Sequence, residues 1–192
     1  MYCVDEFLSA QQVFACNQKK TMTAWHFNNL LKRLSSGDMS ALEQLFNEYY
    51  PKAYAVARLK LKSGADAHDI ASDVIVKLCG LAGMTVKNPD AYVYTMTVNL
   101  VRDFQKQSKP LYVADLQTLD SAVLTNDVSS HDVMDLLSSL AETDKEIFCQ
   151  HVFYELTFAE IAKNLNLSVA TVKRHYAKSC KQLQSEINDC GK

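Results

Sequence analysis

Residues 155–173 read ELTFAEIAKNLNLSVATVK, and this pattern predicts two closely spaced helices. Thr157 and Glu160 have the spacing of a capping box, so a short helix is expected to follow Thr157. The run 164–167 is a tight connection, and Ser168 supplies the cap of a longer second helix. Two helices separated by about four residues, the second of them basic, form a helix-turn-helix.

The second helix of this pair has two unlike faces. At helical spacing one side carries a mainly apolar set, which is Val172, Tyr176, Ser179, Cys180, Leu183 and Ile187. The other side carries Ala170, Arg174, Lys178 and Lys181, flanked by Thr171 and Lys173. Such a helix can lie in the major groove of DNA, where Arg and Lys reach phosphates or guanine edges. An ordinary solvated basic face is the alternative.

The rest of the chain also predicts helices. Apolar residues recur at helical spacing over 25–34, 42–61, 66–79, 133–140 and 147–153. Asn88 and Pro89 supply a cap and a first helical residue for a helix that ends near Gln107. With five Gly and three Pro in 192 residues, the sequence indicates an all-α fold with short connections.

Composition excludes several classes of protein. Hydrophobic residues make up 48% and charged residues 22%, which is typical of a folded globular chain. The net charge is −2, so nucleic acid would have to be bound by local basic patches. No apolar run approaches the roughly 18 residues of a membrane span. The first residues carry Asp5 and Glu6 and no early basic residue, unlike a secretory signal, so a cytoplasmic chain is expected.

No pattern of catalytic or metal-binding residues is present. The six cysteines include no C-x-x-C pair, and no phosphate-binding glycine loop, zinc-binding helix motif or nucleophile elbow occurs. We therefore expect a protein that is not an enzyme and has no metal or other cofactor.

A shift in composition divides the chain into parts. Lys and Arg are absent between Lys109 and Lys145, while acidic residues accumulate there. The interpretation is an extension of unknown role at 1–22, a helical domain at 23–108, a flexible acidic linker at 109–130 and a second helical domain at 131–192.

Two helices of the first domain also have distinct faces. On the 66–79 helix one face carries Asp66, Asp69, Ile70, Asp73 and Lys77, opposite Ala67, Ala71, Val74, Ile75 and Leu78. On the 89–107 helix Val93, Met96, Leu100 and Phe104 form the expected core stripe. Its other side carries Thr95, Asn99, Arg102 and Lys106, an amide-and-cation strip that suits a phosphate backbone.

Three motifs together resemble a known family. The 155–173 stretch resembles the promoter-binding domain four of bacterial sigma factors. The stretch 66–70 with Asp73 and Val74 resembles the polymerase-binding helix of sigma domain two. The stretch 99–103 with Lys106 resembles the end of that domain's promoter helix. The three motifs follow one another in the order typical of the family. Their distribution over two domains, 26–108 and 131–188, resembles the extracytoplasmic-function (ECF) group of sigma factors.

The resemblance implies a transcription initiation factor that binds core RNA polymerase and promoter DNA. The polymerase would be bound by Asp66, Asp69, Ile70, Asp73 and Lys77. The minus-ten element, including an unstacked base held by the 80–87 loop, would be bound by Met84, Lys87, Asn99, Arg102 and Lys106. The minus-thirty-five element would be bound by Ser168, Ala170, Thr171, Lys173, Arg174, Lys178 and Lys181. An inhibitory anti-sigma factor is a further partner consistent with the family.

Simpler interpretations of each feature stay open. The acidic face of the 66–79 helix is compatible with a solvated surface, the 80–87 loop with a plain connector, and the linker with a tether. Two rival functions also stay open: a helix-turn-helix regulator that acts on duplex DNA without polymerase, and a helical module that binds an acidic protein.

Overall fold

Helices account for all the regular secondary structure in the described part of the chain. The computed structural model describes residues 22–61, 63–81, 83–107, 134 and 136–190. Its helices are α2 (Ala24–Ser35), α3 (Met39–Lys60), α4 (Gly64–Cys79), α5 (Pro89–Gln107), α7 (Glu142–Val152), α8 (Phe158–Leu165) and α9 (Val169–Cys190). The all-α prediction is confirmed for these residues, while the predicted linker at 109–130 and most of the 1–22 extension lie outside them. Among the same residues no helix is both long and apolar enough to cross a membrane.

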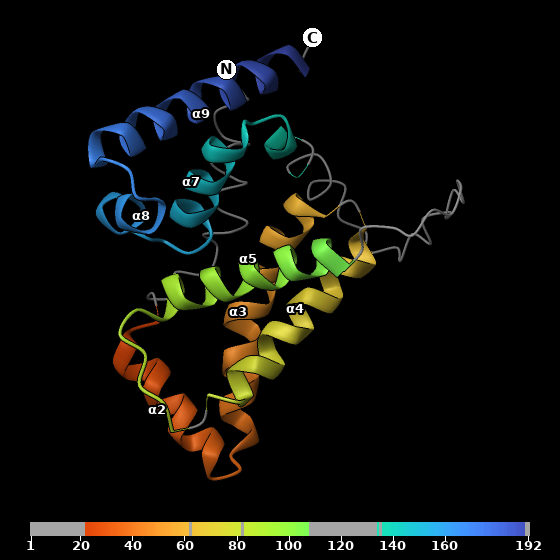
Figure 1. The fold of residues 1–192 in the computed structure, drawn as a ribbon, viewed down its shortest axis with the longest axis vertical. Helices are drawn as coiled ribbons and strands as arrows, with labels where there is room; N and C mark the ends of the chain where they lie inside the picture. The colour runs from red at the N-terminus through yellow and green to blue at the C-terminus, as the bar shows by residue number, and fades with distance from the viewer. Residues whose placement is uncertain (1–21, 62, 82, 108–133, 135, 191–192) are drawn as a thin grey trace.

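Helix α3 is the centre of the first half, and α2, α4 and α5 all pack against it (Figure 1). Its side chains Leu45, Tyr49 and Val56 are buried, and they share one core with Leu78 of α4 and Val93 of α5. A second, smaller group of buried residues lies where α3, α4 and α5 meet and consists of Ala57, Leu61, Ala67, Ile70 and Val101. The α4 residues expected on its apolar face are all buried, so this part of the prediction is confirmed.

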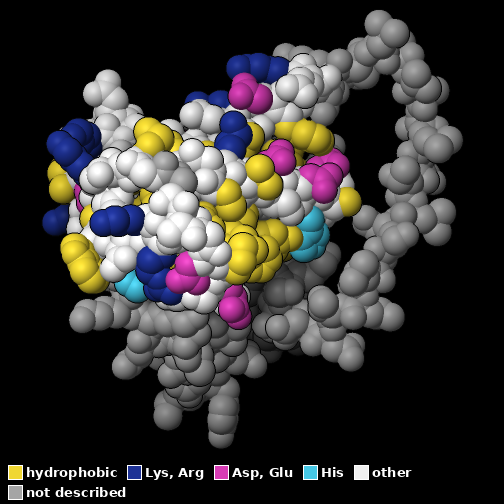
Figure 2. Space-filling model, turned by 90° about the horizontal axis from the view of Figure 1, so that it is seen from below, with side chains coloured by type: hydrophobic (Ala, Val, Ile, Leu, Met, Phe, Trp, Pro, Cys, Tyr) yellow, Lys and Arg dark blue, Asp and Glu magenta, His cyan; other side chains and the backbone are white. Residues whose placement is uncertain are grey.

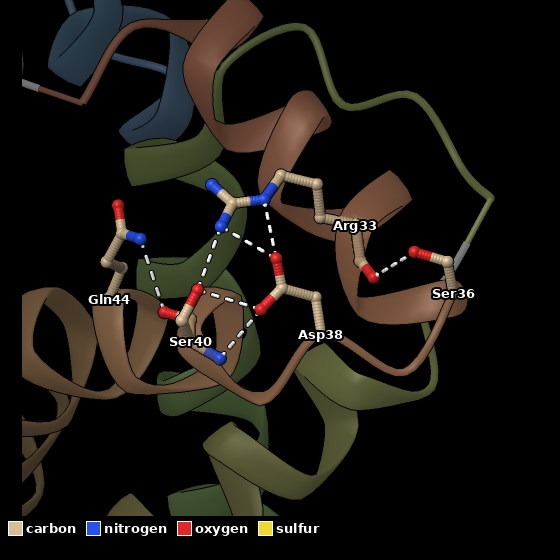
Figure 3. A network of polar contacts seen from close by, with 5 residues as sticks. All are labelled: Arg33, Ser36, Asp38, Ser40 and Gln44. Atoms are coloured by element: carbon tan, nitrogen blue, oxygen red, sulfur yellow. Dashed lines mark hydrogen bonds and ion pairs between the residues drawn. The ribbon is translucent and has the colours of Figure 1, made fainter.

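A polar network fixes the corner between α2 and α3 (Figure 3). Gly37 has a φ of 85°, a left-handed conformation that glycine adopts without a steric penalty. The next residue, Asp38, caps α3 by accepting a hydrogen bond from the Ser40 backbone N–H at 2.9 Å. The Arg33 guanidinium donates two hydrogen bonds to the same carboxylate, at 2.9 and 2.7 Å. The Gly37–Asp38 pair therefore ends the turn after α2 and also starts α3.

Changing Asp38 to Asn should remove a pH-dependent contribution to stability. Hydrogen bonds from Ser40 and Arg33 lower the pKa of Asp38 to about 2. Because this pKa is below that of the unfolded chain, the contribution is present above about pH 4 and is lost as the pH falls toward 2. Urea unfolding from pH 2 to pH 7 should therefore show Asp38→Asn less stable than the wild type at neutral pH, with the two curves converging in acid. The control Asp73→Asn, at an exposed position of α4, should have the same free energy of unfolding as the wild type at every pH.

The second half includes α7 and the helix-turn-helix formed by α8 and α9. The predicted capping box is confirmed: Glu160 N–H donates to Thr157 Oγ1 at 3.3 Å, and Thr157 N–H donates to Glu160 Oε2 at 2.9 Å. Asn166 ends α8 in the left-handed conformation, with φ of 55°. Ser168 Oγ then accepts from the Thr171 N–H at 3.0 Å at the start of α9. These contacts fix the angle between α8 and α9.

The two halves pack against each other along α5, which lies between α3 and α7 in Figure 1. Tyr154, just after α7, is fully buried, and its ring contacts the ring of Tyr94 on α5 in an edge-to-face arrangement with centroids 5.4 Å apart. One buried cluster consequently spans both halves.

This packing changes the expected core stripe of α5. Only Val93 of the four expected residues is fully buried, and Met96, Leu100 and Phe104 are partly buried. Tyr94, Thr97, Val98 and Val101 are buried in addition. The periodicity of α5 could not show this second buried face, because Tyr154 in the distant half covers part of it.

Candidate nucleic-acid interface

The outer face of α9 is exposed and basic. Ser168, Ala170, Lys173, Arg174, Lys178 and Lys181 are exposed, and Thr171 is partly exposed. Val172, Ser179 and Leu183, on the inner face, are buried against α7 and α8. The structure therefore brings the residues predicted for the minus-thirty-five element onto one accessible surface, in the second helix of a helix-turn-helix.

A buried carboxylate anchors α9 to α7. Asp144 Oδ1 lies 2.5 Å from His175 Nδ1, and Lys178 Nζ donates to Asp144 Oδ2 at 3.0 Å. Burial alone would raise the pKa of Asp144, but the hydrogen bonds from His175 and Lys178 outweigh it and lower the pKa. Lys178 thus has a structural partner that the sequence did not indicate. By contrast, Lys173, Arg174 and Lys181 form no ion pair with any residue in the described ranges, so their charges remain available to a phosphate.

The surface predicted for polymerase lies on α4. Asp69, Asp73 and Lys77 are exposed, and Asp66 is partly exposed. Ile70 does not belong to this surface: it is only 3% exposed, because Ala57, Leu61 and Val101 surround it where three helices meet. Val76, which the sequence reading left out, is 67% exposed and lies one turn beyond Asp73. An apolar side chain among acidic ones is a pattern that suits a protein partner.

Aromatic side chains continue this surface from α4 onto α3. The rings of Tyr54 and His68 stack with centroids 4.3 Å apart, and those of Phe46 and Tyr50 at 4.6 Å. The Tyr50 hydroxyl lies 2.8 Å from His68 Nδ1. The view from the end of the molecule where α2 and α3 meet shows apolar side chains crossing the face, with charged side chains of both signs around them (Figure 2). The contacts of Tyr50 and Tyr54 with His68 could not be predicted from the sequence, because they join α3 to α4.

The residues predicted for the minus-ten element follow α5 from end to end and do not form one cluster. Met84 and Lys87 line a hollow of about 400 Å³ beside the start of α5. Asn99, Arg102 and Lys106 are exposed further along the helix. Lys106 lies 3.3 Å from Asp103 in an exposed pair, which contributes little to stability. This layout suits a strand that runs along the helix.

Polar bridges join the two halves at both ends of α5. Lys60 Nζ lies 2.5 Å from Glu142 Oε1 and 3.3 Å from Glu146 Oε1. At the other end Asn88 Nδ2 donates to Glu160 Oε1 at 2.6 Å, so the carboxylate of the capping box also holds the residue that caps α5. Arg102 lines a hollow of about 430 Å³ between the halves, together with Lys60 and the two glutamates.

Changing Lys60 to Gln should loosen the contact between the halves. Burial lowers the pKa of Lys60, but Glu142 and Glu146 outweigh this and raise it, so the side chain stays charged at neutral pH. Loss of a charged hydrogen bond of this kind reduces the stability of the contact by about 1.5–3 kcal/mol. Solvation of the glutamates offsets part of this loss. Small-angle X-ray scattering should show a larger radius of gyration for Lys60→Gln, and no change for Lys32→Gln on the exposed side of α2.

No metal site was found in the part of the chain that the structure describes, where no group of three or more His, Cys, Asp or Glu residues could hold an ion. Cys79, Cys149 and Cys180 are free thiols. Burial raises the pKa of Cys149 to about 12, so that thiol is unreactive at neutral pH.

Each half of the chain matches a known protein family. A family model of sigma-70 region 2 matches residues 45–110, and one of sigma-70 region 4 matches residues 130–183. The chain is 21% identical over 182 residues to the ECF RNA polymerase sigma factor SigW of Bacillus subtilis (strain 168), covering 83% of this chain and 95% of that protein.

Two solved structures are also similar. The fold matches that of CnrH, solved in complex with the cytosolic domain of CnrY, with a TM-score of 0.58 and 18% identity over 84% of this chain and 97% of that one. The RsbN–BldN complex has a TM-score of 0.35 and 17% identity over 81% of this chain and 97% of that one.

Proposed function

The chain belongs to the sigma-70 family of transcription initiation factors, in its ECF group. On this basis we propose which of its surfaces bind core RNA polymerase and which bind promoter DNA. In this proposal the exposed face of α4 binds core RNA polymerase, α9 binds the minus-thirty-five element, and the 80–87 loop with α5 assists strand separation at the minus-ten element. The role is not enzymatic, since the proposed steps are binding steps.

The observation that carries the proposal is the exposed basic face of α9 in an intact helix-turn-helix. Lys173, Arg174 and Lys181 are accessible there, in a chain whose net charge is −2. Because the whole chain has no overall positive charge, it is not attracted to DNA in a general way. The basic residues on one face of α9 favour binding of DNA in one orientation. Helix α4 lies well apart from α9 (Figure 1), which leaves room for polymerase and promoter to be bound at once.

The minus-ten role rests on the hollow beside α5 and on the strip that follows it. Met84 and Tyr92 are exposed at the hollow, and exposed apolar groups of this kind can contact the face of an unstacked base. Unstacking a base costs a few kcal/mol, which such contacts and the phosphate contacts of Arg102 and Lys106 would offset.

An anti-sigma factor is proposed as a further partner. CnrH, whose fold this chain shares, was solved in complex with the cytosolic domain of CnrY. The aromatic stack and Val76 beside the acidic face of α4 supply the apolar contacts that a protein inhibitor needs. Such an inhibitor would compete with polymerase for the same face.

The test is reconstitution of the full chain with a bacterial core RNA polymerase, followed by genome-wide mapping of transcript starts. We expect a new set of start sites that share two spaced elements. A gel shift with and without core enzyme separates the proposal from a regulator that acts alone, because the proposed factor should bind duplex promoter strongly only with polymerase. Failure to direct any start sites would contradict the proposal.

A further inference from the structure

We propose that Asn28 of α2 is a positioning residue for the minus-ten loop. Its side-chain amide holds Val86 in place, so that residues 84–88 form the hollow before a promoter base arrives. The inference rests on the proposed function and deepens it, because it assigns a role to a residue outside the three motifs that resemble the family.

The contact between Asn28 and the loop has two hydrogen bonds. Asn28 Nδ2 donates to the Val86 carbonyl oxygen at 3.0 Å, and the Val86 N–H donates to Asn28 Oδ1 at 2.8 Å. One amide side chain therefore satisfies both backbone groups of one residue, as a neighbouring strand does in an antiparallel sheet. The two residues are 58 positions apart, so the contact ties α2 to the loop between α4 and α5.

Holding Val86 also sets the direction of its neighbours. The Val86 side chain is buried in the main core, whereas Thr85 and Lys87 are exposed. Since Val86 is held inward, Thr85 and Lys87 are directed outward, and both line the hollow.

Contacts within the loop fix its two ends. At the start, Met84 N–H donates to the Leu81 carbonyl at 2.9 Å, and Gly83 has a φ of 84°. At the end, Asn88 Oδ1 accepts from the Ala91 N–H at 3.0 Å and caps α5. In the described part of the loop, 83–88, these contacts leave the middle residues without a local backbone partner, and Asn28 supplies one to Val86 from α2.

The hollow so formed has the size and chemistry for a base. Its volume of about 400 Å³ falls within the roughly 300–1,000 Å³ of small-molecule pockets. Met84 and Tyr92 offer apolar surface, and Lys87, Thr85 and Thr95 offer hydrogen-bonding groups. A loop that is already ordered loses less conformational entropy when it binds, so the Asn28 contact should favour capture of the base.

The experiment compares Asn28→Ala with Asn29→Ala, a matched change at the next position of α2, in full-length chain assembled with core polymerase. Promoters carry an abasic nucleotide at each non-template position of the minus-ten element in turn, and the open-complex fraction is measured. On the intact promoter Asn28→Ala should lower the open-complex equilibrium about tenfold, because two hydrogen bonds are lost, while Asn29→Ala stays within about twofold of the wild type. At the position of the captured base, removing the base should lower the open-complex equilibrium about tenfold in the wild type. In Asn28→Ala the same removal should lower it less than about threefold.

A second measurement shows whether the contact exists in solution. Hydrogen exchange of the Val86 amide in the full-length chain should be faster in Asn28→Ala than in the wild type and unchanged in Asn29→Ala. If Asn28→Ala folds poorly, Asn28→Asp keeps the acceptor for Val86 N–H and loses the donor to its carbonyl, and it should show the same loss at the same promoter position.

The outcomes separate this inference from the proposed function. An Asn28 variant that opens promoters as well as Asn29→Ala, or that is impaired equally on every abasic template, would overturn the inference while the initiation role stands. A wild-type holoenzyme that opens no promoter would overturn the proposed function, and the inference with it.

Discussion

Reversing the charge of Lys173 and Arg174 to Glu should reduce the affinity of the holoenzyme for duplex carrying the minus-thirty-five element by about 100-fold or more. Each lost contact between a basic side chain and a phosphate or guanine edge is worth about 1–3 kcal/mol, and the introduced carboxylates add repulsion. Both side chains are exposed and form no ion pair within the described ranges, so the fold should be unaffected. Fluorescence anisotropy with a labelled duplex at several salt concentrations measures the affinity and its salt dependence.

Two controls make this result specific. Lys32→Glu reverses one exposed charge on α2 and should change the affinity less than about threefold, since α2 and α9 lie at opposite ends of the molecule (Figure 1). Lys178 is left out of the variant because it bonds the buried Asp144, and a glutamate there would place two carboxylates together and destabilise α9. Equal loss on a duplex with a scrambled element would contradict sequence-specific binding by this face.

The second large effect is expected at α4, where Asp69→Arg together with Asp73→Arg should weaken binding to core polymerase about 100-fold. Both carboxylates are exposed, so reversing them should leave the helical fold intact while opposing a basic partner surface. Like charges facing each other across an interface cost several kcal/mol, and the encounter rate falls as well. Competition for core enzyme against the labelled wild-type chain gives the affinity, and circular dichroism verifies the fold.

The matched control changes two exposed acids elsewhere. Asp103→Arg together with Glu155→Arg alters the net charge equally at sites on α5 and after α7. Its affinity for core enzyme should stay within about threefold of the wild type, because these positions lie outside the α4 face. Normal assembly of the Asp69 and Asp73 variant would contradict this site and leave the role of α9 untouched.

Features specified by neighbouring residues could be predicted from the sequence. The Thr157–Glu160 capping box and the cap at Asn88 are set by residues three apart, and both form as expected. The two faces of α9 follow from its own period. In each case the chemistry that fixes the structure lies within one or two turns.

Features created by distant residues could not be predicted in this way. The Asn28–Val86 contact, the anchoring of Lys178 by Asp144, and the covering of α5 by Tyr154 join residues far apart in the chain. Ile70 lies at the edge of an acidic face by periodicity, and contacts from α3 and α5 bury it. These details depend on how the helices pack, which one helix's sequence does not show.

The double role of Glu160 affects how mutational scans of this protein should be interpreted. Its carboxylate caps α8 through Thr157 and also accepts a hydrogen bond from Asn88 at 2.6 Å. An alanine at this position would alter the geometry of the helix-turn-helix and the approach to the minus-ten loop together. A screen for promoter activity would thus score Glu160 as if it touched DNA, and epistasis with Asn88 would reveal its indirect effect.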